Sequence, residues 1–395
     1  MKPFTRKFFA PIIASLALLT QLGAETPQEI NIVLRDRSGP LNGKAVQRVE
    51  KWKPTETAII ICDMWSCHPC PHATARLREM APELNKVLKD ARKQGILIIH
   101  SPSGGMGHYP KDLPARKKSA KYRKGFGDPV HWHYWEHVHG GNQVSKISNP
   151  REQNVPYPLR SGDSRCREFG ETSGPFSNKQ TEFIEIDDND ILTDDFKEIK
   201  DYLKENGYKN VILSGVHTDM CVIGRPFGLR AMVKAGYNTV LMRDLTDSAW
   251  NCASRQKNVT DHYTGQRLLS AYIEQYVCPT ITSVDISGRD EFRFAEDGYT
   301  SRETLAAREA KLHLEKVKVE IESAFYGTTE TEGINVTEKV RKALNGTLRI
   351  PIGDYNTVFS DPAVGDQKYL WIKYKIAGKT KTLRFPEGAQ VLLTK

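Results

Sequence analysis

Short, uninterrupted apolar runs alternate with amphipathic stretches over the middle of the chain. The apolar runs have the length and continuity of strands that are buried on both faces of a parallel sheet. The amphipathic stretches carry apolar side chains at helical spacing. The predicted strands are 58–62, 96–99, 211–213 and 239–242, and the predicted helices are 82–94, 195–206 and 265–277. This alternation predicts an α/β fold over residues 57–280, with a three-layer, Rossmann-like parallel sheet and helices on both faces.

The flanking regions follow other patterns. Residues 25–56 are polar and rich in proline, which predicts an extended lead-in with one edge strand at 31–35. Residues 281–315 form a charged linker with a helix. Over residues 316–395, short alternating runs are bounded by Gly, Asn and Asp-Pro turns, which predicts a small C-terminal β-sandwich domain.

Residues 1–24 have the pattern of a secretory signal peptide. Basic residues precede an apolar stretch at 8–19, and Gly23-Ala24 offers small residues for cleavage. The apolar stretch is too short for a convincing membrane span. We therefore expect an exported protein, periplasmic or extracellular, with no stable membrane span after the signal is cleaved.

Charge adds little to this picture. The chain has 57 basic and 48 acidic residues. Without Lys2, Arg6 and Lys7 of the signal peptide, the balance is 54 against 48, a small excess that is spread along the chain. The densest basic run, at 116–124, is typical of a solvated loop. We expect a small-molecule substrate and no nucleic-acid partner.

The cysteine count constrains the disulfides. An exported chain with seven cysteines, at 62, 67, 70, 166, 221, 252 and 278, keeps at least one thiol or forms an intermolecular pair. Cys70 and Cys166 are the first candidates for a bridge, although a sequence cannot fix connectivity.

Cys221 lies in the most informative stretch. The strand at 211–213 ends in Ser214-Gly215, and a helix-like stretch then runs from Cys221 to Gly236. A thiol at a helix N-terminus is expected to be more acidic and more nucleophilic than an ordinary one. The alternative is a buried core cysteine that follows a turn.

The residues around Cys221 resemble the nucleophile turn of the isochorismatase-like cysteine hydrolases, which include nicotinamidases and carbamoylsarcosine amidases. The matching stretch is Gly215-Val216-His217-Thr218-Asp-Met-Cys221-Val222, and the resemblance covers about residues 57–280. It implies a Cys221 nucleophile, an oxyanion site formed by the turn, and a non-proline cis peptide between Val216 and His217. These hydrolases often associate, so a homo-oligomer is also expected.

Asp63 directly follows the strand at 58–62. Active-site residues of open α/β sheets gather at the carboxyl ends of strands, although an Asp after a strand is also a common helix cap. The resemblance implies that Asp63 is the general base that takes the proton of the Cys221 thiol.

The third catalytic residue of the family, a lysine, has no clear counterpart. The passage at 183–194, where it is expected, is acidic, and the nearest candidate is Lys179. Lys179 either projects into the pocket or is an exposed loop lysine. The presence of a cation between Asp63 and Cys221 therefore separates an active hydrolase from a protein that has lost activity.

A metal site is a further hypothesis. Cys67, His68, Cys70 and His72 bring four potential ligands within six residues. The resemblance implies that His68 and His72 could help to hold zinc or a similar ion, although no cofactor is required. The competing explanations are a disulfide at Cys70 and a polar pocket wall at His68.

Further pocket residues are expected from strand ends and from the long irregular segment 102–180. Trp65 follows Asp63, and His100 ends the second strand, either lining the pocket or serving as a hydrogen-bonded structural histidine. Trp132 and Trp135 lie in a stretch rich in His and aromatic residues at 131–139. The alternatives for the stretch 131–139 are a lid over the substrate, a surface excursion and a second metal site.

The last 80 residues also carry a resemblance. Ala324-Phe-Tyr-Gly327, Asn335-Val-Thr337 and Asp361-Pro362 are similar to the C-terminal β domain of some J-domain proteins. This implies an accessory or binding module. The sequence thus predicts an exported cysteine hydrolase that cleaves an amide-like C–N or related bond. The alternative is a non-catalytic exported binding protein on the same scaffold.

Overall fold

The computed structural model describes ten ranges of the chain. They are residues 28–37, 45–68, 70–123, 176–249, 262–298, 319–344, 349–350, 355–376, 378–387 and 391–393. The predicted signal peptide at 1–24 lies outside these ranges, as do residues 299–315 of the predicted linker. No helix of the described residues is long and apolar enough to cross a membrane.

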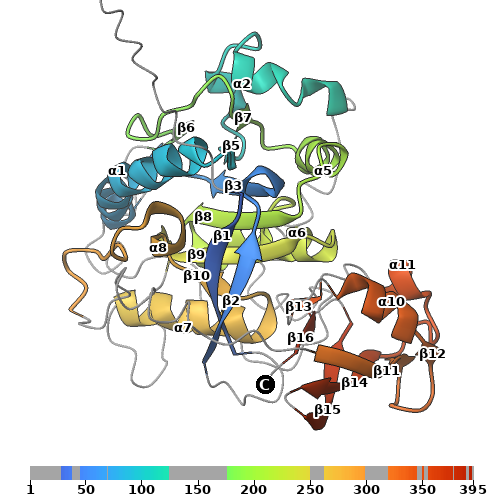
Figure 1. The fold of residues 1–395 in the computed structure, drawn as a ribbon. Coiled ribbons are helices and arrows are strands. Elements are labelled where there is room, and N and C mark those ends of the chain that lie inside the picture. Colours follow the sequence, from blue (N-terminus) through green and yellow to red (C-terminus); the bar gives the residue numbers. More distant parts are fainter. Residues whose placement is uncertain are drawn as a thin grey trace, which may run out of the picture.

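A mixed eight-stranded sheet forms the centre of the larger part (Figure 1). Its order is β2-β1-β10-β9-β8-β3-β5-β7, and the strands from β10 to β7 are parallel. The parallel strands are β3 Thr57–Cys62, β5 Leu97–Ser101, β7 Ile191–Leu192, β8 Asn210–Val216, β9 Asn238–Asp247 and β10 Thr280–Ile281. The predicted α/β class is therefore confirmed.

Helices cover both faces of this sheet. Alternate side chains of β3 point to opposite faces, so Ile59 and Ile61 pack with α1, whereas Ala58 and Ile60 pack with α5, α6 and α7. The helices are α1 Pro71–Lys93, α2 Pro114–Lys117, α5 Phe196–Glu205, α6 Leu229–Lys234, α7 His262–Tyr276 and α8 Val284–Ser287. Shorter elements are η2 Pro54–Glu56, η3 Met106–His108, η4 Ala120–Tyr122, η6 Thr218–Val222 and the antiparallel pair β4 Trp65–Cys67 and β6 Ser177–Gln180.

Two sequence predictions need correction in this part. The lead-in forms two strands, β1 Ile30–Asp36 and β2 Val46–Trp52, and β1 joins the sheet by pairing with β10. Helix α1 begins at Pro71 rather than at residue 82, because its apolar face continues through Ala73 and Leu77. The Cys70 sulfur caps it by accepting the Ala73 N–H, and Pro82 lies inside the helix.

The C-terminal residues form a second core around a four-stranded antiparallel sheet. Its strands are β11 Val319–Gly327, β12 Ile334–Asn335, β14 Tyr369–Ile376 and β15 Lys379–Pro386, with α10 Thr337–Ala343, α11 Tyr355–Phe359 and the pair β13 Arg349–Ile350 and β16 Val391–Leu392 (Figure 1). The predicted β-sandwich was wrong in its second layer, because the apolar side chains of α10 and α11 follow helical spacing and pack on the sheet. The resemblance to J-domain proteins stays a prediction.

Candidate active site

Neighbouring strands bring Asp63 and Cys221 together. Asp63 follows β3, Cys221 follows β8, and the two strands are parallel with Cys62 paired to Gly215. Gly215 has φ +114°, and a Cβ atom there would lie 2.0 Å from the carbonyl oxygen of Cys62. Only glycine allows this close approach, which sets the Cys221 turn against the end of β3.

The turn itself is a single π-helical segment, η6 Thr218–Val222. The peptide bond between Val216 and His217 is cis, as predicted. The expected helix from Cys221 to Gly236 is interrupted, however, and α6 begins only at Leu229. Pro226 explains the break, because proline lacks the N–H that a helix interior needs.

Asp63 is buried and faces both Cys221 and an arginine. Its Oδ1 accepts a 2.6 Å hydrogen bond from the Ser103 N–H, and its Oδ2 lies 3.6 Å from Nε of Arg225. Within the described residues Oδ2 accepts no hydrogen bond. The Cys221 thiol interacts with the Asp63 carboxylate and with the Arg225 guanidinium.

Arg225 is the residue that sequence reasoning missed. It is 7% exposed and carries a positive charge beside Asp63 and Cys221. Lys179, the predicted cation, lies on β6 with its side chain exposed. The four-residue spacing from Cys221 to Arg225 was the available signal, since residues four apart can share one face of a helical turn.

Burial controls the protonation of this cluster. Burial and the Asp63 charge raise the pKa of the Cys221 thiol well above its ordinary value, and Arg225 opposes them only in part. Burial also raises the pKa of Asp63. The expectation of an unusually acidic thiol was therefore wrong, because the helix dipole is absent and a carboxylate is close. In the resting site Cys221 is a thiol beside a potential proton acceptor.

Aromatic rings form a wall next to the turn. The His68 ring meets the His217 ring edge-on with centroids 4.7 Å apart, and Trp65 stacks beside His68. Burial lowers the pKa of His217 well below its ordinary value, so this ring is neutral. Trp132 and Trp135 lie outside the described residues.

The predicted metal ligands do not form a site in the described part of the chain. No group of three or more His, Cys, Asp or Glu side chains there is arranged to hold a metal ion. His68 Nδ1 accepts a hydrogen bond from the Cys70 N–H, and His72 lies on α1. Within these residues His68 and His72 are therefore not joined by a third ligand, and the zinc site stays a prediction.

The structure shows which of the described cysteines are thiols and which one is in a disulfide. Cys70 is in a disulfide whose partner lies outside the described residues, so its pairing with Cys166 stays a prediction. Cys62, Cys67, Cys221 and Cys278 are thiols.

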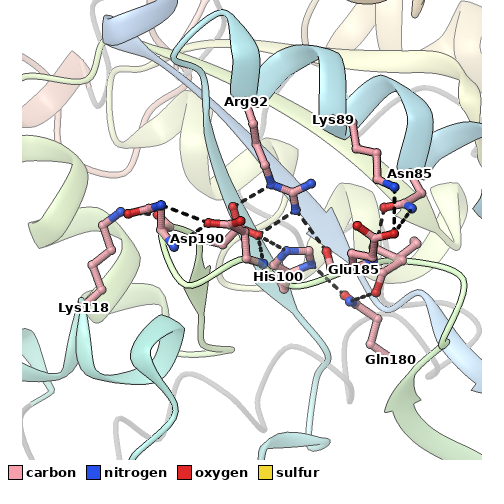
Figure 2. Close-up of polar contacts among 11 residues, drawn as sticks. Asn85, Lys89, Arg92, His100, Lys118, Gln180, Glu185 and Asp190 are labelled. Carbon is pink, nitrogen blue, oxygen red and sulfur yellow. Dashed lines mark hydrogen bonds and ion pairs between the residues drawn. The ribbon is translucent and has the colours of Figure 1, made fainter.

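His100 belongs to a structural network rather than to the Cys221 site. Its Nδ1 lies 2.9 Å from Gln180 and its Nε2 lies 3.0 Å from Asp190, so both ring nitrogens are used (Figure 2). Arg92 of α1 also pairs with Asp190 at 2.7 Å. Burial opposes ionisation of Asp190, but His100 and Arg92 lower its pKa overall. This network fixes β5, β7 and α1 together.

The fold and the site together define an α/β protein with a buried Cys–Asp–Arg cluster at the carboxyl ends of neighbouring parallel strands. No family model matches the chain, and no curated protein matches it with significance.

Some solved structures are weakly similar to this chain. A cysteine hydrolase from Pseudomonas syringae pv. phaseolicola is 13% identical, with a TM-score of 0.35 over 60% of this chain and 93% of its own. A pyrazinamidase of Pyrococcus horikoshii in complex with zinc is 14% identical, with a TM-score of 0.31 over 57% and 99%. An isochorismatase family protein from Burkholderia thailandensis is 13% identical, with a TM-score of 0.31 over 60% and 96%. These likenesses are too weak to assign a family.

Proposed function

We propose that this protein is a cysteine hydrolase of the isochorismatase-like type, which cleaves an amide-like C–N bond or a related bond in a small molecule. The observation that carries the proposal is the buried contact of the Cys221 thiol with the Asp63 carboxylate and the Arg225 guanidinium. A nucleophile beside a general base, with a third group that fixes the base, is the usual sign of covalent catalysis.

In this mechanism Asp63 takes the proton from the Cys221 sulfur. The Ser103 N–H holds Oδ1 of Asp63, which leaves Oδ2 for the proton. The thiolate then attacks the substrate carbonyl, the amine leaves with a proton from Asp63, and water releases the acyl group from sulfur. The charge of Arg225 stabilises the thiolate that forms next to it.

The oxyanion is assigned to the turn at Gly215–Cys221. The N–H groups of Met220 and Val222 already donate to the carbonyl oxygen of His217, at 3.0 and 3.1 Å. We therefore assign the oxyanion contact to the N–H of Cys221 itself, between these two.

The alternative is an exported binding protein that has lost the family lysine. That alternative assumes that no cation lies beside Asp63 and Cys221. Arg225 supplies such a cation, and its charge is constant over the physiological pH range. Arg225 therefore favours the enzyme.

We also propose that the protein works after export, on a small-molecule substrate, with residues 316–395 as an accessory module. The basic and apolar pattern of residues 1–24 supports export, as does the disulfide at Cys70, because disulfides persist in oxidising compartments.

The direct experiment is ammonia release from a panel of small primary amides by the purified protein. Cys221→Ala is expected to lower the rate at least about 1,000-fold, because the nucleophile is lost. Cys278→Ala is the matched control, since Cys278 is also a buried thiol but is not part of the Asp63 cluster. Hydrolysis that survives in Cys221→Ala would refute the mechanism.

A further inference from the structure

A second buried charged cluster lies on the other side of the Cys221 turn. The Asp247 carboxylate, at the end of β9, pairs with Nε of Arg76 at 2.8 Å and with Nε2 of His262 at 2.7 Å. All three side chains are buried and come from β9, α1 and α7. Because β8 lies between β3 and β9 in the sheet, this cluster and Asp63 flank the turn from opposite sides.

The cluster is tied directly to the turn. The Thr218 hydroxyl donates to the carbonyl oxygen of Asp247 at 3.0 Å. The Gln266 amide, from the same helix as His262, donates to Thr218 Oγ1 and to the carbonyl oxygen of Thr246. The Asp219 carboxylate accepts the N–H of Ala249. His262 is therefore held in a fixed position relative to the turn that carries Cys221.

Among the residues that the structure describes, the buried polar atoms without a hydrogen-bond partner include two at this cluster. They are Nδ1 of His262, whose residue is 3% exposed, and Oγ of Ser248, which directly follows Asp247. A buried polar atom without a partner is costly, so a native protein usually keeps one for a reason. In the neutral ring Nε2 donates to Asp247, and Nδ1 is then a hydrogen-bond acceptor.

We propose that His262 and Ser248 form a polar subsite that binds an uncharged amide group of the substrate. His262 Nδ1 accepts an N–H of that amide, and the Ser248 hydroxyl supplies a second hydrogen bond beside it. Asp247 is a positioning residue, because it orients the imidazole through Nε2. This inference rests on the proposed function and deepens it by naming an N–H donor as the recognised feature.

The test compares two alkylating agents, of which only one carries N–H groups. Iodoacetamide and N,N-dimethyl-2-iodoacetamide are both neutral and have the same reactive carbon, but only the first can donate to His262. Alkylation of Cys221 is followed by mass spectrometry of its peptide, and rates are normalised to those of a small free thiol. We expect Cys221 to prefer iodoacetamide about fivefold to tenfold, the size of one net hydrogen bond.

The informative variant is His262→Gln. The Gln amide reaches Asp247 in place of Nε2 and keeps that hydrogen bond, but it has no atom equivalent to Nδ1. The preference for iodoacetamide is expected to disappear in this variant and to persist in His108→Gln, a change at an exposed histidine. Ser248→Ala keeps His262 intact and is expected to lower the preference about threefold.

The outcomes separate this inference from the proposed function. A preference that persists in both His262→Gln and Ser248→Ala would reflect the bulk of the methyl groups and would overturn the subsite. Equal rates for the two reagents in the unmodified protein would overturn it as well. A Cys221 that resists both reagents would instead overturn the proposed nucleophile, and the subsite with it. If His262→Gln does not fold, the preference for iodoacetamide in Ser248→Ala alone decides whether the subsite exists.

Discussion

At the scale of single residues, the site depends on how two buried charges act on one buried thiol. The Asp63 charge and the Arg225 charge act on the Cys221 thiol in opposite directions, and burial acts with Asp63. A thiol in this setting stays protonated until a substrate arrives, and the proton has an acceptor next to it. The resting sulfur is therefore protonated and weakly nucleophilic, and it becomes a reactive thiolate when Asp63 takes its proton.

Arg225 gives the first prediction. Arg225→Met removes the cation, so we expect the pH midpoint for alkylation of Cys221 to rise and amide hydrolysis to fall at least about 100-fold. Arg225→Lys keeps the charge and is expected to leave the midpoint close to that of the unmodified protein. The measurement is the alkylation rate of Cys221 against pH in the three proteins. A midpoint that falls in Arg225→Met would contradict the assigned role.

The removal of Arg225 also leaves Asp63 buried without its ion pair, at a cost of about 3 kcal/mol. The double variant Asp63→Asn, Arg225→Met therefore serves as the control for folding, because it removes both charges together.

Much of the residue-scale site could be read from the sequence. Asp63 and Cys221 were placed at strand ends because continuous apolar runs mark buried strands and their last residues. Arg225 was missed, although its four-residue spacing from Cys221 and the helix break at Pro226 are both visible in the sequence. The exposure of the Lys179 side chain could not be predicted from the sequence, since it follows from the pairing of β6 with the distant β4.

At the scale of elements, Gly215 determines how closely β8 approaches β3. Gly215→Ala would force a Cβ atom against the Cys62 carbonyl and a positive φ on alanine. We expect the free energy of unfolding to fall by at least about 2 kcal/mol, with loss of Cys221 reactivity, as measured by urea denaturation and alkylation.

Gly207 is the matched control for this change. It also has a positive φ, of +75°, but no atom lies within 4 Å of its virtual Cβ. Gly207→Ala is expected to cost about 1 kcal/mol and to leave Cys221 reactivity intact. Equal losses in the two variants would show that backbone conformation, rather than the contact with Cys62, matters at Gly215.

Strand β2 could not be predicted from the sequence. Strand β2 is held by its pairing with β1, and β1 by its pairing with β10 more than 240 residues away. The strand predicted at 31–35 is present as β1, but β2 is short and partly polar, so its own sequence pattern does not indicate a strand.

At the scale of the whole molecule, the described chain has separate hydrophobic cores in its α/β part and its C-terminal part. Each part has its own sheet. The sequence predicted this division correctly in outline, because the hydrophobic period changes from buried runs to strict alternation after residue 316.

This division predicts local effects of core substitutions. Ile372→Ala, in the centre of β14, is expected to destabilise the C-terminal part by about 3 kcal/mol and to leave alkylation of Cys221 unchanged. Ile60→Ala, in β3, is expected to cost about as much in the α/β part and to alter that alkylation. Hydrogen exchange by peptide would locate each loss. A change of Cys221 reactivity in Ile372→Ala would contradict independent cores.

The central claim is that Asp63 and Cys221 form one coupled unit, and the alkylation rate of Cys221 by iodoacetamide against pH tests it most directly. In the unmodified protein the pH midpoint should lie above the value of about 8.5 for an ordinary thiol, because burial and Asp63 raise the pKa of Cys221. In Asp63→Asn the negative charge is gone and Arg225 remains, so the midpoint should fall while amide hydrolysis is lost. Identical midpoints near the ordinary value in both proteins would contradict the account.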